Sequence, residues 1–243
     1  MIKKRLLLIL LLFIAAGCTE STQPIIEKVD TVPYDSNREP ALIEQQEEEE
    51  EKIEQYIEFS LFDEQVLINL EMVPILNEYL KGVQDEEAAI NEMKLEKLPL
   101  SEHQIYLMEF SCVNDLCSYL LFNQNGENSA YLVADLAKSA NTLISPDQSK
   151  IALHFSRING KSEHLDNLVV VDLQEWKLSA WNNEPDGANI LNYTWPFVAV
   201  EWLDDTTLTV RRPDILEPTS ASISEWQELG GTKLISTHLH IAD

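Results

Sequence analysis

Residues 144–155 read ISPDQSKIALHF, and residues 167–173 read NLVVVDL. Both stretches contain an apolar run of strand length that is rich in β-branched or aromatic residues. Ser-Pro-Asp at 145–147 predicts a turn before the first strand, because Pro presets the backbone angle φ and the Asp147 carboxylate accepts hydrogen bonds from backbone amides. The two stretches are therefore expected to be neighbouring strands.

Similar strands are expected on both sides of this pair, and turn residues separate them. Their spacing of roughly ten residues is typical of antiparallel meanders. A β-rich domain is accordingly predicted over residues 99–243. Its expected strands are 104–110, 118–122, 130–134, 151–156, 168–172, 177–181, 198–203, 207–211 and 234–241.

The pair at 144–173 resembles the repeat of TolB-type β-propellers, in which a Ser-Pro-Asp turn precedes one strand and the next strand ends in Val-Asp-Leu. Partial copies are residues 198–210 and 130–136. The resemblance implies two to three propeller blades, which is fewer than a closed ring needs. The array would then be open or truncated and covered by helices, or the likeness would be local. It also implies that Asp147 is a structural turn residue and that the sheets bind proteins or peptides.

Residues 53–98 carry apolar side chains at three- and four-residue steps, which predicts helices. Pro74 is expected to kink or end a helix near Met72, and Gly82 to end the next one. These helices would pack on the same domain, or form a coiled segment or partner-binding arm. The predicted fold class is therefore α+β, with a short N-terminal helical segment followed by a mostly antiparallel β region.

The N-terminus has the parts of an export signal. Lys3, Lys4 and Arg5 are followed by an unbroken apolar run at 6–14, which is too short for a spanning helix of about 20 residues. Residues 15–18, Ala-Ala-Gly-Cys, resemble the lipobox of bacterial lipoprotein precursors. The resemblance implies that residues 1–17 are a signal peptide, that cleavage falls between Gly17 and Cys18, and that Cys18 carries the lipid. The alternative is an ordinary signal peptide with an incidental Cys18.

Residues 18–52 are expected to be an acidic, flexible tether, because Pro residues alternate with Ser, Thr and Asp. The five Glu residues at 47–51 fit a solvated helix start or linker, with a weak cation site as the alternative. The formal net charge is −25, and it is −28 from Cys18 onward because no acid lies in the leader. Such a charge repels phosphates, so no nucleic-acid partner is expected.

Cys112 and Cys117 are predicted to form a disulfide, since an exported chain folds in an oxidising space. Their spacing is poor for zinc and too long for a redox Cys-x-x-Cys motif. His238 and His240 alternate on one predicted strand and are expected to lie on an exposed polar face. The five Trp residues, all in the β region, fit core packing or a carbohydrate- or peptide-binding platform.

No G-x-S-x-G, H-E-x-x-H or P-loop motif occurs, so no catalytic residue, metal or cofactor is predicted. We expect a non-enzymatic accessory module on the extracytoplasmic face of the cell membrane, with a protein or peptide partner. The alternatives are a solute- or carbohydrate-binding lipoprotein and, less favoured, an envelope hydrolase.

Cys18→Ser is expected to abolish lipid labelling and to leave the precursor uncleaved or released, because the hydroxyl does not replace the thiolate that takes the lipid. Metabolic labelling with a radioactive fatty acid, followed by membrane fractionation, measures both effects. Cys112→Ser is the matched control and is expected to stay labelled. A Cys18→Ser chain that is still labelled and membrane-bound would contradict the lipobox interpretation.

Overall fold

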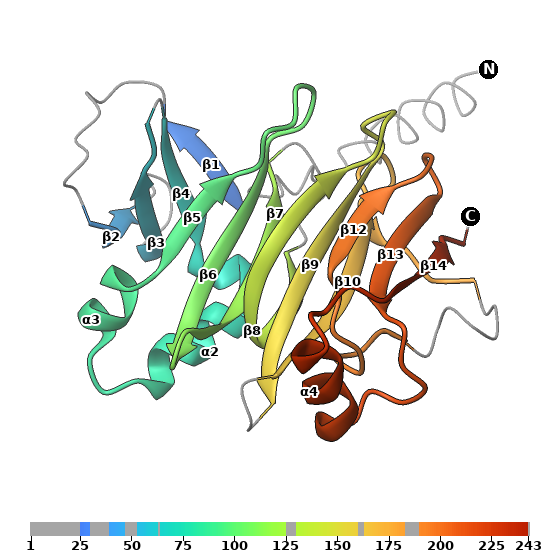
Figure 1. Cartoon of the computed structure of the whole chain (residues 1–243). Coiled ribbons are helices and arrows are strands. Elements are labelled where there is room, and N and C mark those ends of the chain that lie inside the picture. The colour runs from blue at the N-terminus through green and yellow to red at the C-terminus, as the bar shows by residue number, and fades with distance from the viewer. Residues whose placement is uncertain are drawn as a thin grey trace, which may run out of the picture.

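The computed structural model describes residues 25–29, 39–46, 53–62, 64–124, 130–159, 163–182 and 190–242. The described chain is mostly antiparallel β-structure arranged in sheets of four, seven and three strands, with short helices between them. Figure 1 shows the sheets following one another across the molecule in chain order, from blue through green and yellow to red. No helix within the described ranges has the length and apolarity needed to cross a membrane.

The N-terminal sheet has the strand order β1-β4-β3-β2. Its strands are β1 (Ile26–Val29), β2 (Ala41–Gln46), β3 (Ile53–Ser60) and β4 (Gln65–Asn69). The prediction of helices from residue 53 is therefore wrong for β3 and β4. Two parts of the expected 18–52 tether, β1 and β2, are also strands, because each pairs with a neighbour in this sheet.

The physical reason lies in periodicity. In β3, Ile57 and Phe59 are buried on one face while Glu58 between them is half-exposed, which is the two-residue period of a strand. All five residues of β4 are buried, so its sequence does not alternate at all. A short apolar run of this kind is compatible with a strand and with a helix. Here it forms a strand because it pairs with β1 and β3.

Within the residues that the structure describes, the named helices lie in one short stretch after this sheet and one near the C-terminus. A 3₁₀ turn (η2, Leu70–Met72) leads into α2 (Pro74–Gly82) and α3 (Glu86–Asn91). Pro74 begins α2 rather than ending a helix, because the first helical turn does not need the amide hydrogen that Pro lacks. Gly82 ends α2 as predicted.

The central sheet has the order β11-β10-β9-β8-β7-β6-β5. Strand β8 folds it into two halves: residues 131–137 pair with β7, and residues 138–144 pair with β9. The backbone of β8 bends where Leu136 takes a φ of 45° and where the register shifts after Ser139. The strands are β5 (Lys94–Lys97), β6 (Ile105–Val113), β7 (Leu116–Asn123), β8 (Tyr131–Ile144), β9 (Lys150–Asn159), β10 (Glu163–Asp172) and β11 (Lys177–Leu178).

The C-terminal sheet has the order β12-β13-β14. Its strands are β12 (Ala199–Trp202), β13 (Thr207–Pro213) and β14 (Leu234–His240). Helix α4 (Ser220–Glu228) lies between β13 and β14, and Thr219 caps its N-terminus. All nine strands predicted between residues 104 and 241 occur, with shifted ends.

Three hydrophobic clusters separate successive β layers. The first joins the N-terminal sheet and α2 to one face of β6 and β7, including Tyr106 and Phe122. The second lies between the two halves of the central sheet, where the ring centroids of Tyr119 and Phe155 are 5.1 Å apart. The third joins the far face of β9 and β10 to the C-terminal sheet. The layers therefore stack face to face.

The predicted fold class, α+β with a helical N-terminal segment, is wrong. The described chain is mostly antiparallel β-structure that begins with a sheet, and its helices are short. Within the β region, strand β8 belongs to both halves of one seven-stranded sheet. Because residues 137–144 contain no Gly or Pro, β8 continues from one half-sheet into the next and keeps seven strands in one hydrogen-bonded sheet.

A buried carboxylate joins the N-terminal sheet to the central sheet. The Glu64 side chain is 0% exposed, and its Oε2 lies 3.0 Å from Lys28 Nζ on β1 and 3.1 Å from Lys97 Nζ on β5. Tyr106 on β6 donates to Glu64 Oε1 at 2.9 Å. Burial by itself raises the pKa of Glu64, but these three hydrogen bonds outweigh it and hold that pKa below its ordinary value.

Glu64→Gln is expected to lower the free energy of unfolding by about 2–3 kcal/mol, because two Lys ammonium groups lose their shared anion. Urea unfolding measures this loss. The exposed Glu78, which pairs with Lys81 on the surface, is the matched control, and Glu78→Gln should change stability by less than about 0.5 kcal/mol. Equal effects of the two variants would contradict a structural role for Glu64.

The same variant has a predicted pH dependence. A carboxyl group whose folded pKa is lowered stabilises the fold above its unfolded pKa of about 4.3, and this contribution is lost as pH falls through the folded value. The stabilities of the wild type and Glu64→Gln are therefore expected to converge below roughly pH 4.

Candidate interaction groove

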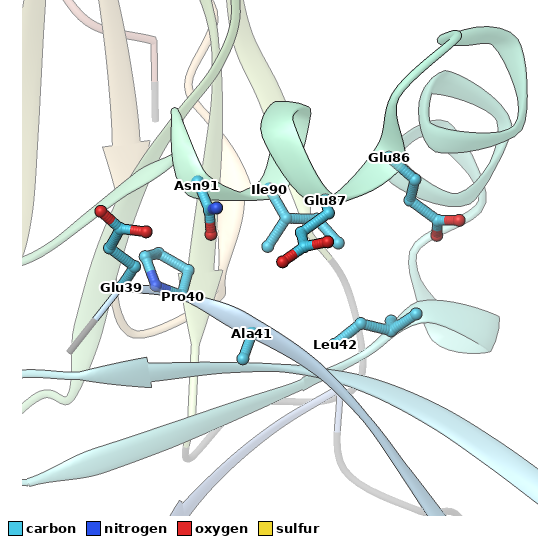
Figure 2. A pocket seen from close by; sticks show the side chains of 8 residues that line it. All are labelled: Glu39, Pro40, Ala41, Leu42, Glu86, Glu87, Ile90 and Asn91. Atoms are coloured by element: carbon cyan, nitrogen blue, oxygen red, sulfur yellow. The ribbon is translucent and has the colours of Figure 1, made fainter.

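A groove of about 560 Å³ lies between strand β2 and helix α3. Figure 2 shows Glu87 and Asn91 extending from α3 toward the strand, with Ala41 and Leu42 on the opposite side. Its volume is within the usual range for ligand pockets. The lining residues are Glu39, Pro40, Ala41, Leu42, Glu86, Glu87, Ile90 and Asn91.

Local sequence places both walls of the groove. Asp85 caps α3 by accepting a hydrogen bond from the amide of Ala88 at 3.0 Å, and Glu86 and Glu87 follow in the first turn, where negative charge suits the helix dipole. Ile90 is buried in the first hydrophobic cluster, and Leu42 packs against the same cluster. The floor of the groove is therefore apolar and continuous with the core.

The rim of the groove is acidic. Glu39, Glu86 and Glu87 are all exposed. Across the described residues, no Lys, Arg or His side chain forms an ion pair with these three carboxylates. Strand β2 is also the outer strand of its sheet among the described strands, so one side of its backbone has no strand partner there. This arrangement suits an extended ligand that brings positive charge.

A second cavity, of about 650 Å³, lies at the turn between β6 and β7. Glu109 accepts from Lys94 Nζ at 2.7 Å and from the Tyr119 hydroxyl at 3.0 Å. Burial, with the neighbouring Glu109 charge, raises the pKa of Tyr119 to about 12 although the Ser139 amide donates to its oxygen. Tyr119 is thus a neutral donor at neutral pH. The other lining residues are Asn91, Glu92, Cys112, Asp115, Cys117 and Lys138.

The predicted disulfide between Cys112 and Cys117 is present, with a Cα–Cα distance of 4.0 Å. It joins β6 to β7 across the turn at the edge of this cavity. One Glu109 oxygen and both sulfurs lie within 4.8 Å of one another. Because both sulfurs belong to the disulfide, neither is the thiolate that ligates a metal.

Asp147 lies in the turn between β8 and β9. Its Oδ1 accepts from the Ser149 amide at 3.0 Å and from the Ser145 hydroxyl at 2.7 Å. The Ser149 amide is the main reason why the pKa of Asp147 is lowered to about 2. The backbone amide of Asp147 donates to Asp205 at 2.9 Å, which ties this turn to the C-terminal sheet.

The histidines lie away from both cavities. His238 and His240 share one face of β14, where each contacts a Thr hydroxyl on β13, Thr209 at 3.1 Å and Thr207 at 3.2 Å. His154 Nε2 lies 2.8 Å from Asp166 Oδ1, and the Phe197 amide donates to the other carboxylate oxygen of Asp166 at 2.6 Å. The His154–Asp166 pair thus connects β9 and β10 to the chain before β12.

The tryptophans pack in different places rather than on one platform. Trp176 and Trp195 are buried in the second and third clusters, and Arg212 stacks over the ring of Trp195. Trp181 and Trp202 pack against the third cluster. Trp226 donates to the backbone oxygen of Lys233. The lining of the two cavities contains no Trp.

Gly17, Cys18 and the five Glu residues at 47–51 lie outside the described residues. The groove itself was not predicted from the sequence. Its only local signal is the Asp-Glu-Glu run at 85–87, which by itself is typical of any helix start.

Comparisons with known protein families, curated proteins and solved structures find no match.

Reduction of the Cys112–Cys117 bond is expected to lower the free energy of unfolding by about 2 kcal/mol, the chain-entropy value for so short a loop. Urea unfolding with and without a dithiol reductant measures this difference. The Cys112→Ser, Cys117→Ser double variant is the matched control and should not respond to reductant. An equal shift of the double variant and the wild type would contradict the expected effect.

Proposed function

We propose that the protein is an extracytoplasmic lipoprotein, held at the membrane by lipid on Cys18, that acts as a non-enzymatic binding module for a protein or peptide partner. The observation that carries the binding function is the groove between β2 and α3, which combines an apolar floor, an acidic rim and an outer sheet strand. The leader and the Ala-Ala-Gly-Cys sequence support the anchor.

Chain length limits how far the N-terminal sheet can lie from the proposed anchor. Strand β1 begins at Ile26, eight residues after Cys18. A fully extended chain spans at most ~3.6 Å per residue, so the N-terminal sheet starts within roughly 30 Å of the lipid. A partner in the groove would then be near the membrane surface.

A binding module is favoured over a hydrolase because neither described cavity is lined by histidine. The His154–Asp166 pair lies outside both cavities, and Asp166 also accepts a hydrogen bond from the backbone amide of Phe197. These contacts connect two layers of the structure. Its hydrogen bonds therefore suit structure better than proton transfer.

A second candidate is a small-solute-binding lipoprotein, and the observation that favours it is the cavity beside the disulfide. Lys94, Lys138, Glu109 and Tyr119 offer charges of both signs and a neutral hydroxyl there, which suits a small polar solute. The Trp-lined pocket expected for a carbohydrate ligand is absent from the two described cavities.

In-cell crosslinking followed by affinity purification of the lipid-anchored chain is expected to recover a stoichiometric protein partner. The Cys18→Ser chain is the control, and it should recover less of that partner because it no longer concentrates at the membrane. Recovery of no partner would contradict the proposal. If no partner is recovered and small polar solutes raise the melting temperature, the second candidate is correct.

A further inference from the structure

The geometry points to the chemical class of the partner: we propose that the groove between β2 and α3 binds an extended, cationic peptide segment that adds as a strand to the outer edge of β2. This inference rests on the proposed function and deepens it. Three separate features of the groove support it: backbone, floor and charge.

Among the described strands, β2 is paired on one side of its backbone only. Strand β2 pairs with β3 from Ala41↔Glu58 to Gln46↔Ile53, and among the described strands nothing pairs with its other side. Unpaired strand edges accept an extended peptide by continuing the hydrogen-bond ladder, which supplies affinity independent of sequence. Figure 1 shows β2 at the margin of the molecule, beside α3.

The floor of the groove suits an apolar side chain on such a segment. Leu42 and Ile90 line the groove from the strand and the helix; Leu42 is half-buried and leaves apolar surface for contact, whereas Ile90 is only 2% exposed. In an added strand, side chains alternate between two faces, so every second residue of the peptide would point to the same wall. One apolar side chain between Leu42 and Ile90 would extend the first hydrophobic cluster.

The charge of the groove selects a cation. Glu39 lies on the strand side at one end of the groove, Glu87 extends from α3 toward the strand, and Glu86 lies at the other end, so carboxylates are spread along the length that a Lys- or Arg-containing segment would cover. No described basic side chain already neutralises them. The formal net charge of −25 adds a long-range attraction for cations and a repulsion of acidic peptides.

The test uses the full mature chain, lipid included, in a neutral detergent. The probe is the hexapeptide acetyl-(Lys-Val)₃-amide, titrated by calorimetry at low and high salt. An alternating Glu-Val hexapeptide tests charge. A Lys-Val hexapeptide with every internal backbone amide N-methylated keeps the charge but cannot donate along either edge, and so tests strand addition.

The proposal expects saturable binding of the Lys-Val peptide, weakening with salt, and no binding of the other two peptides. The triple variant Glu39→Gln, Glu86→Gln, Glu87→Gln should weaken binding roughly tenfold. The matched control removes three exposed acids elsewhere, as Glu217→Gln, Glu225→Gln, Glu228→Gln, and should change binding less than about twofold. Glu39→Gln alone leaves α3 unchanged and should shift binding in the same direction.

Three results would overturn the proposal. Equal weakening by both triple variants would mean general attraction to an acidic surface. Undiminished binding of the N-methylated peptide would exclude strand addition. Absence of peptide binding, while a protein partner is still recovered from cells, would place that partner elsewhere on the chain and leave the proposed function standing.

Discussion

Burial of both faces of the central strands is the constraint on which the rest of the structure depends. In β6, Tyr106 and Met108 face the first hydrophobic cluster, whereas Ile105 and Leu107 face the second. Strand β10 is likewise apolar on both faces, with Val171 in the second cluster and Leu168 and Val170 in the third. Leaving one face in water would expose several large side chains, at about 1.5–3 kcal/mol each. Further β layers must therefore cover these strands on both sides.

The stack of layers explains where a site can form. Inner layers are covered on both faces, so an open surface there lies at strand ends, as in the cavity beside the turn between β6 and β7. The N-terminal sheet is an outer layer, and a groove lies between its outer strand β2 and helix α3. The buried Glu64 cluster holds this sheet against the central one. Stability and the proposed recognition therefore depend on the same layer.

Parts of the fold could be predicted because their signals are local. Strands beyond residue 104 combine β-branched residues with turns, and only four residues lie between Cys112 and Cys117, which are joined across one turn. Strands β3 and β4 could not be assigned in this way, because short apolar runs satisfy the helical and the strand period together. Helix α4 was missed because only Ile223 of its residues is buried, which leaves little apolar periodicity.

The candidate groove could not be predicted, because its walls are distant in sequence. Glu39 on one wall and Glu87 on the other are brought together only when α3 packs on β2. The same limit applies to Glu64, whose partners Lys28 and Lys97 come from strands of two different sheets. The spacing of residues within one strand or helix does not reveal such contacts between distant parts of the chain.

By itself, the sequence determined the acidity of the chain, the strands of its C-terminal part and the cysteines that form the disulfide, because these depend on composition or near neighbours. Only the tertiary structure decided that residues 53–60 and 65–69 are strands, that β8 joins two half-sheets, and that an acidic groove opens beside β2. The physical reason is that pairing and burial of both strand faces involve residues far apart in the chain, and these contacts override local preference.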